Sequence, residues 1–127
     1  MTRTVIRNAR VWDGSGAAAF PADVLFDTDR IRTIARAPGQ LDAAGAEVID
    51  AKGMTLMPGL IEGHAHITFI NGARPTDIGD TPPEEHTLIA ARNARILLDS
   101  GFTGAYSAAS AKLRIDTVIR NAIDAGD

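Results

Sequence analysis

The sequence predicts an α/β fold in which a small β-sheet precedes a βαβα unit, the start of a parallel sheet. Two observations carry this prediction. Residues 1–57 consist of short strand-like segments separated by turn residues. After Pro58-Gly59 the period changes, and strand-like segments alternate with segments of helical period. The 127 residues suffice for one modest core.

Residues 1–57 are predicted to form a small antiparallel sheet. The turn at residues 13–16 closes the first strand, and Thr28-Asp29 joins the next two strands in a hairpin. Ile31 and Ile34 do not keep a two-residue period, which predicts a bulge or an early end in the third strand. Trp12 is expected in the core of this sheet. The predicted strands span residues 4–12, 23–27, 30–35, 47–50 and 54–57.

Residues 58–127 are predicted to begin a parallel sheet. Residues 60–70 are apolar or small except at Glu62 and two histidines, which is typical of a strand buried on both faces. A shorter strand is expected over residues 101–107 and a helix over residues 114–125. Two strands and two helices cannot cover both faces of such a sheet, so we expect the front part of a longer protein. The inward-facing residues expected on the second helix are Ile115, Val118, Ile119 and Ala122, and Gly126 is expected to end it.

The helix between these strands has a marked start and stop. Thr81 is predicted as its N-cap, with Pro82 at the first helical position and Glu84 at the capping-box position. The helix is expected to end near Ser100, with Gly101 just past its end. Its predicted buried stripe comprises Leu88, Ala91, Ala94, Leu97 and Leu98.

The composition excludes several classes of protein. Thirteen Lys and Arg against sixteen Asp and Glu give a net charge of −3, without the basic cluster that a nucleic-acid-binding or membrane-surface protein needs. The absence of cysteine excludes disulfide scaffolds, thiolate zinc sites and cysteine nucleophiles. No signal-peptide core is present, and no apolar run approaches the about twenty residues that span a bilayer. We therefore expect a cytoplasmic protein that binds neither nucleic acid nor membrane.

His64 and His66 are the candidate metal ligands. At positions i and i+2 of a strand their side chains point to the same face, where two neutral imidazoles can share one divalent ion. Two imidazoles inside an apolar strand need polar partners, and a metal ion is a common one. Glu62 lies on the same face as a candidate ligand or as an acceptor that orients the histidines. The alternative is a His-x-His pair that arises by chance in a strand or loop.

The residues around these histidines resemble a known signature. Residues 57–66, Met-Pro-Gly-Leu-Ile-Glu-Gly-His-Ala-His, are similar to the Pro-Gly-Leu-Ile-Asp-x-His-x-His signature of the amidohydrolase superfamily. Residues 5–14 resemble the N-terminal strands of this superfamily, and residues 48–53 resemble the segment that leads into its first barrel strand. Residues 101–103 match the Gly-x-Thr opening of the second barrel strand, and residues 113–126 resemble the helix that follows. The similarity covers essentially the whole chain and is greatest to the imidazolonepropionase and prolidase-like branch.

The resemblance implies a fold and a metal site. The fold is a (β/α)8 TIM barrel with a small β-sandwich formed by both chain ends, so residues 58–127 supply roughly a quarter of the about 250 residues of a barrel. His64 and His66 would bind the more buried of one or two divalent ions, most commonly zinc. The remaining ligands, a lysine, two histidines and an aspartate, come from later strands. Glu62 stands where the signature has Asp.

The resemblance also implies a reaction. A hydroxide activated by the metal would attack an amide or cyclic-amide C–N carbon of a small, peptide-like molecule. The aspartate that moves the proton lies beyond residue 127, so no catalytic residue is expected within this segment, which alone would be inactive. A homo-oligomer is expected.

Three further residues are candidate substrate contacts, each with a plainer alternative. His86 follows the start of the first helix, where a solvent-exposed position is the alternative. Arg74 lies in the loop after the first barrel strand, where loops carry specificity, and is otherwise a plain loop residue. Tyr106 lies near the end of the second strand and otherwise serves packing.

A second function of another class fits the same residues. A non-catalytic truncated or split homologue would act by pairing an exposed sheet edge with a second, complementing polypeptide. The later ligands, which this chain does not contain, motivate that alternative.

Overall fold

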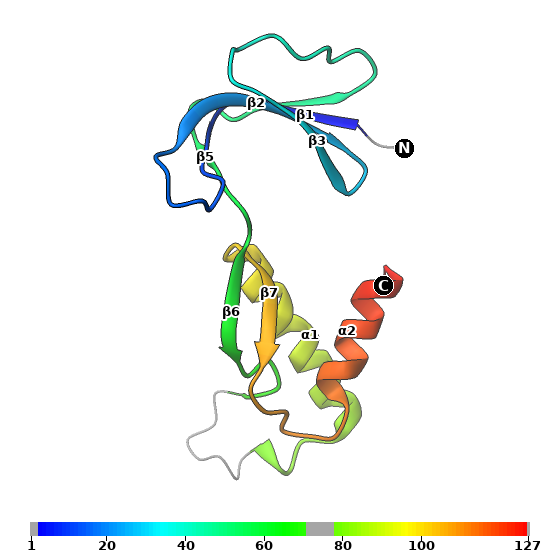
Figure 1. Cartoon of the computed structure of the whole chain (residues 1–127). Coiled ribbons are helices and arrows are strands. Elements are labelled where there is room, and N and C mark those ends of the chain that lie inside the picture. The colour runs from blue at the N-terminus through cyan, green and yellow to red at the C-terminus, as the bar shows by residue number, and fades with distance from the viewer. Residues whose placement is uncertain (1–2, 71–77, 127) are drawn as a thin grey trace. The chain divides into compact units, whose positions relative to one another are not determined.

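The protein is described by a computed structural model that covers residues 3–70 and 78–126. The chain divides into two compact units, Met1–Pro58 and Gly59–Asp127, which are treated separately below (Figure 1). Strands fill the first unit, and strands alternate with helices in the second, which confirms the predicted α/β fold. Within the described ranges, no helix is long and apolar enough to cross a membrane.

The first unit is a five-stranded mixed sheet. β2 pairs antiparallel with β1 and with β3, whereas β4 and β5 run parallel to β1. The prediction of an antiparallel sheet is therefore wrong for its last two strands. The segment 36–46 is long enough to cross the sheet and bring the chain back beside β1 in the same direction, which a tight hairpin cannot do. The strands are β1 (Arg3–Val11), β2 (Phe20–Asp27), β3 (Arg30–Ala35), β4 (Glu47–Asp50) and β5 (Thr55–Leu56).

The bulge expected in the third strand is present. Leu25 and Phe26 of β2 pair with Thr33 and Ile31 of β3, so that Arg32 is the extra residue. A bulge moves the side chains that follow it to the other face of the sheet. For this reason Ile31 and Ile34 do not keep the two-residue period of a regular strand.

A buried carboxylate supports a second irregularity, in the middle of β1. The pairing of β1 with β2 shifts register between Ile6 and Ala9, and Asn8 has a left-handed φ of 55°. Asp23 is 1% exposed and accepts hydrogen bonds from the N–H groups of Asn8 at 2.9 Å and Gly39 at 2.8 Å. The carboxylate thus provides the partner that the Asn8 N–H lacks in the ladder.

The side chain of Asn8 links β1 to the end of β4. Asn8 Nδ2 donates a hydrogen bond of 2.9 Å to Asp50 Oδ1, which also accepts the N–H of Lys52 at 2.9 Å. These two donors stabilise the carboxylate form, and they lower the pKa of Asp50 below its ordinary value.

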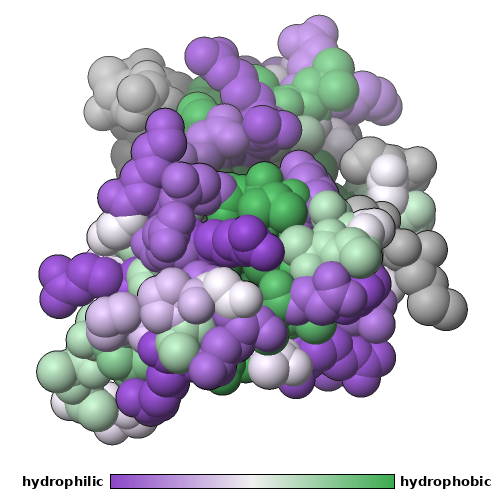
Figure 2. Space-filling view, turned by 90° about the horizontal axis from the view of Figure 1, so that it is seen from above, coloured by the Kyte–Doolittle hydropathy of each residue, from purple (hydrophilic) through white to green (hydrophobic). Residues whose placement is uncertain are grey.

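The core of the first unit is small and lies on one face of the sheet. Trp12 lies outside this core and is 37% exposed, which corrects the prediction for this residue. Alternation along the strand explains the difference, because Val11 is buried and its neighbour points the other way. On the face seen in Figure 2, hydrophobic surface is open to solvent between hydrophilic side chains. The buried cluster comprises Ala9, Val11, Ala22, Val24 and Ala51.

The second unit is the predicted βαβα unit. Its elements are β6 (Leu60–Ala65), α1 (Pro83–Asp99), β7 (Phe102–Ser107) and α2 (Ile115–Ala125). β6 and β7 pair in parallel and lie side by side, as the prediction required (Figure 1). The two helices pack together around a small cluster formed by Ala90, Ile115 and Ile119.

β6 is shorter and more exposed than predicted. It ends at Ala65 rather than Ile70, and a turn follows in which the N–H of Phe69 donates to the carbonyl of His66. Ile61 is 75% exposed, so the expectation of a strand buried on both faces is wrong for the described chain. β7 pairs with one edge of β6, and in the described residues no other strand pairs with its second edge.

The start of α1 differs from the prediction by one residue. Pro82, with φ −57° and ψ 144°, is the N-cap, and the helix begins at Pro83. A residue before proline is disfavoured in the helical region, so Pro82 cannot be the first helical residue and Thr81 cannot be the cap. The end matches the prediction, because Gly101 has a φ of 93° just past the helix.

The buried face of α1 is rotated relative to the predicted stripe. His86 and Ala90 are completely buried, whereas Leu88 is 73% exposed and Leu98 is 53% exposed. Ala91 is also exposed, and only Ala94 and Leu97 of the predicted stripe are partly buried. The polar side chains of His86 and Asn93 occupy the inner face of the helix because both are hydrogen-bonded to buried backbone.

α2 follows the prediction more closely. Ile115 and Ile119 are buried and Gly126 ends the helix with a left-handed φ of 86°. Val118 was predicted to face inward and is 43% exposed, because the stripe that packs against α1 is narrow.

Replacing Gly59 by alanine is expected to destabilise the second unit. A methyl group on Gly59 would lie 1.9 Å from Thr103 Oγ1 and 2.6 Å from Thr103 Cβ. Because side-chain rotation cannot move Cβ, the backbones must shift, and Gly59→Ala should lower the free energy of unfolding by about 1–3 kcal/mol. Denaturant titration measures this change. Gly63→Ala is the matched control, since nothing lies within 4 Å of its Cβ, and equal midpoints for both variants would contradict the prediction.

The lowered pKa of Asp50 predicts a dependence of stability on pH. A carboxyl whose folded pKa is depressed contributes stability above its ordinary pKa of 3.8, and this contribution is lost as pH falls through the folded value. The unfolding free energy of the natural sequence should fall more than that of Asp50→Asn between about pH 5 and pH 2. Asn8→Gly keeps the left-handed backbone and removes the donor, so it should weaken the same pH dependence. Parallel curves for all three proteins would disprove the assignment.

Candidate metal centre

β6 brings the two predicted metal ligands together at its carboxyl end. His64 lies within the strand and His66 follows its last residue, and their ring centroids are 4.9 Å apart in an edge-on arrangement. Because side chains two residues apart in a strand point the same way, both rings lie on the same side of β6. Both rings line a cavity of about 680 Å³, together with Glu62 of β6 and Asn93 of α1.

The hydrogen bond of His66 suits a metal ligand. Its Nδ1 lies 3.3 Å from the carbonyl oxygen of Ala109, which can only accept a hydrogen bond. The proton is therefore on Nδ1, and the Nε2 lone pair is available to a metal ion. The ring also stacks on Phe69 with centroids 4.3 Å apart. A ligand histidine whose second nitrogen donates to a carbonyl is the usual arrangement at metal sites.

Glu62 contacts the backbone of His64 rather than an imidazole. Its Oε1 accepts the N–H of His64 at 3.0 Å. The pairing of β6 with β7 shifts register between Glu62 and Ala65, which withdraws this N–H from the ladder. The carboxylate therefore fixes the backbone that carries His64, and not the ring.

The two histidines provide an incomplete set of ligands. In the part of the chain that the structure describes, no group of three His, Cys, Asp or Glu side chains is arranged to hold a metal ion. A zinc-type site takes three or four protein ligands. Residues 3–70 and 78–126 therefore offer two candidate ligands and no complete site.

His86 does not lie where the sequence predicted. It is 0% exposed, so the expectation of a solvent-exposed helix residue is wrong, and its side chain offers no surface to a substrate. Its Nε2 donates to the carbonyl oxygen of Thr68, which is also fully buried. Nδ1 has no hydrogen-bond partner among the described residues.

The other two candidate substrate contacts give less information. Arg74 lies outside the described residues. Tyr106 is 71% exposed on β7, so the packing alternative does not hold in the described chain, and its role as a substrate contact stays a prediction.

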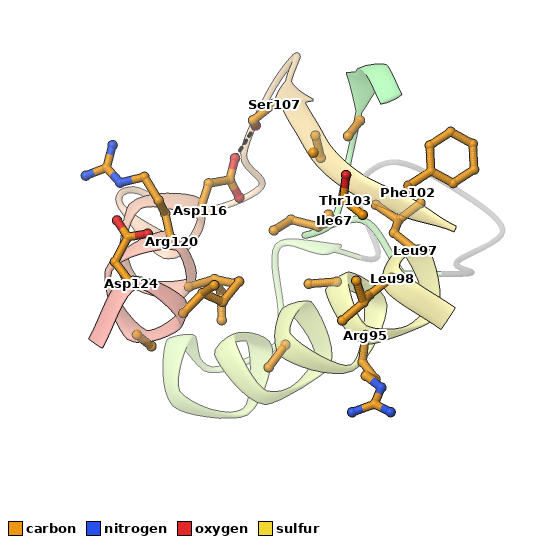
Figure 3. Close-up of a pocket in the computed structure, with 18 of the residues that line it drawn as sticks. Ile67, Arg95, Leu97, Leu98, Phe102, Thr103, Ser107, Asp116, Arg120 and Asp124 are labelled. Atoms are coloured by element: carbon orange, nitrogen blue, oxygen red, sulfur yellow. Dashed lines mark hydrogen bonds between the residues drawn. The ribbon is translucent and has the colours of Figure 1, made fainter. Parts of the chain in front are cut away.

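A larger hollow lies on the helix side of the second unit. Its volume is about 910 Å³, and Figure 3 shows it between β7 and the two helices, with Ile67 and Leu98 pointing inward. Ser107 donates a hydrogen bond to Asp116 at its rim. The lining is largely apolar and contains neither His64 nor His66.

Sequence reasoning missed the residues that support His66. Asn93 donates to the backbone after β6, and Thr68 of that segment accepts the N–H of Ala111 in the loop after β7; neither residue was a candidate. The only sequence signal is a polar side chain seven residues after His86, a spacing that places both on one helix face.

Comparison with known proteins gives one consistent family. The Amidohydrolase family matches residues 47–123. The dihydroorotase of Streptomyces coelicolor is 43% identical over 68 residues, which are 53% of this chain and 14% of that protein. The dihydroorotase of Streptococcus thermophilus is 40% identical over 62 residues, 49% of this chain and 14% of that protein. The chain therefore spans about a seventh of the curated relatives it matches.

Solved structures match almost the whole chain. The crystal structure of an amidohydrolase superimposes with a TM-score of 0.84 and 28% identity, over 98% of this chain and 29% of that one. The crystal structure of a prolidase complexed with N-methylphosphonate-L-proline gives a TM-score of 0.82 and 25% identity, over 98% of this chain and 29% of that one. These structures support the predicted start of a TIM barrel after part of a β-sandwich.

The burial of His86 predicts that its loss is costly. His86→Ala removes a fully buried ring and leaves the Thr68 carbonyl without its donor, so unfolding free energy should fall by about 2–4 kcal/mol. Leu88→Ala, on the exposed face of the same helix, should change it by less than about 1 kcal/mol. Denaturant titration of both variants measures the difference. A larger loss of unfolding free energy for Leu88→Ala would indicate that α1 buries the face predicted from the sequence.

Proposed function

This chain belongs to the amidohydrolase family, and from that premise we propose that it forms the N-terminal part of a metal-dependent hydrolase of amide or cyclic-amide C–N bonds. The observation that carries the proposal is the geometry of His64 and His66 at the end of β6, inside the segment that matches the family. Both histidines are metal ligands in this proposal. The segment alone contributes no catalytic residue.

We propose that the metal is a divalent ion, with zinc as the first choice. The complete site of the full-length protein would hold one or two such ions. When bound, it would lower the pKa of a water molecule and polarise the amide carbonyl. The residues of this chain hold and orient the ligands. His66 keeps its proton on Nδ1 through Ala109, and Glu62 holds the His64 backbone through its N–H.

The substrate class is a small molecule with an amide, peptide-like or cyclic-amide bond. Similarity to dihydroorotases supports a cyclic amide, and similarity to a prolidase supports an amide to proline. The loops after later barrel strands select between them, because substrate contacts of this fold come from all eight such loops. We also propose a cytoplasmic homo-oligomer.

A second function remains a proposal for the same residues. The exposed side chains of Ile61 and Tyr106 support a covering partner for β6 and β7. In a non-catalytic split homologue a second polypeptide would supply that cover. The intact mass of the natural protein distinguishes the two, because a mass of 13.4 kDa would assign the missing strands to another chain.

Loss of either histidine is expected to remove metal from the protein. In the natural full-length protein, His64→Asn and His66→Asn should each lose about half or more of the bound metal, since a site with three or four ligands cannot spare one. Elemental analysis measures metal per chain, and hydrolysis of an acyl-proline dipeptide and of dihydroorotate measures activity. Tyr106→Phe is the control for metal content. Full metal content and full activity in both histidine variants would disprove the proposal.

A further inference from the structure

We propose that Asn93 and His86 of α1 are positioning residues that hold the backbone after β6 and thereby aim His66 at the metal. This inference rests on the proposed function, because it treats His66 as a ligand. Its basis is a set of hydrogen bonds from one helix to three consecutive carbonyl groups, those of residues 67–69.

Asn93 provides two of these bonds. Its Nδ2 donates to the carbonyl oxygen of Ile67 at 2.8 Å and to that of Phe69 at 3.1 Å. His86 Nε2 donates to the carbonyl of Thr68, which lies between them. Residues seven apart lie on one face of a helix, so α1 presents both donors to the same short segment.

The loop after β7 holds the other side of this segment. Thr68 is fully buried, and its Oγ1 accepts the N–H of Ala111 at 2.8 Å. Ala109, two residues earlier, accepts the Nδ1 proton of His66. The His66 segment is therefore fixed between α1 and the β7 loop.

This fixation reaches the imidazole directly. His66 precedes the held segment by one residue, and its ring stacks on Phe69, whose carbonyl Asn93 binds. A shift of Phe69 would therefore turn the ring, and a shift of Ala109 would break the hydrogen bond that orients its Nδ1–H group. Groups that orient a metal ligand in this way influence affinity without touching the metal.

Asn93→Asp tests the inference with little change in shape. The substitution replaces both donor hydrogens by a carboxylate oxygen, which repels the two carbonyl oxygens. In the natural full-length protein, depleted of metal and titrated with Co²⁺ against a chelator, the affinity should fall about tenfold or more. The visible absorption of bound Co²⁺ should also change, because it reports ligand geometry.

Two controls separate positioning from general stability. Asn121→Asp makes the same substitution at an exposed position of α2, and it should leave Co²⁺ affinity and absorption unchanged. Asn93→Gln keeps the donor group and should recover part of the affinity. If Asn93→Asp does not fold, Thr68→Val removes the Ala111 contact from the same segment and should show the same loss.

The outcomes are distinct. A lower melting temperature for Asn93→Asp with unchanged Co²⁺ affinity and absorption would overturn the inference, because the contacts would then serve stability alone. Unchanged Co²⁺ binding in His66→Asn would instead overturn the proposed function. A loss of affinity in Asn93→Asp and Thr68→Val, but not in Asn121→Asp, would support the inference.

Discussion

The candidate site depends on a stretch of backbone that leaves the sheet while it is still buried. β6 ends at Ala65, and Thr68 three residues later is completely buried. A carbonyl group buried outside a strand has no ladder partner, and a buried polar group left unsatisfied costs about 1–3 kcal/mol. The side chains of His86 and Asn93 on α1 donate hydrogen bonds to the carbonyl groups of residues 67–69. The requirement to satisfy this backbone therefore explains why a histidine and an asparagine occupy the inner face of α1 beside Ala90 and Ala94.

The same solution occurs at two irregular strand pairings of this protein. In the first unit Asp23 accepts the N–H of Asn8, which the bulge in β1 removes from the ladder. In the second unit Glu62 accepts the N–H of His64, where β6 and β7 lose register. In both places a carboxylate replaces a strand partner. Irregular pairing thus creates the need for a polar side chain, and near β6 this need coincides with the two histidines.

Local signals predicted most elements, and long-range pairing limited the rest. The hairpin, the bulge at Arg32 and the glycine ends of both helices follow from residues close in sequence. The parallel pairing of β4 with β1 depends on where the segment 36–46 returns, which no local pattern encodes. The predicted N-cap was wrong although the signal was local. Pro83 disfavours a helical conformation at Pro82, so Pro82 rather than Thr81 became the N-cap.

In the candidate site, too, local patterns could be predicted from the sequence and long-range contacts could not. The His-x-His spacing was visible in the sequence, since both rings need only a strand to share a face. The burial of His86 was not, because a histidine between Glu85 and Thr87 in the first turn of a helix resembles an exposed residue until its partner is known. That partner is a backbone carbonyl, and every residue has one. The sequence therefore identifies candidate ligands more readily than the groups that orient them.

Glu62 departs from the family signature and still contacts the backbone of His64. The signature has Asp at this position, and Glu adds one methylene. The Glu62 carboxylate accepts the N–H two residues ahead at 3.0 Å, where the register shift between β6 and β7 has removed this group from the ladder. Aspartates of this chain accept the N–H at the same spacing, as Asp50 does from Lys52 at 2.9 Å, so reach alone does not require a glutamate. The carboxylate therefore satisfies the backbone that carries His64, and nothing in the structure explains the extra methylene.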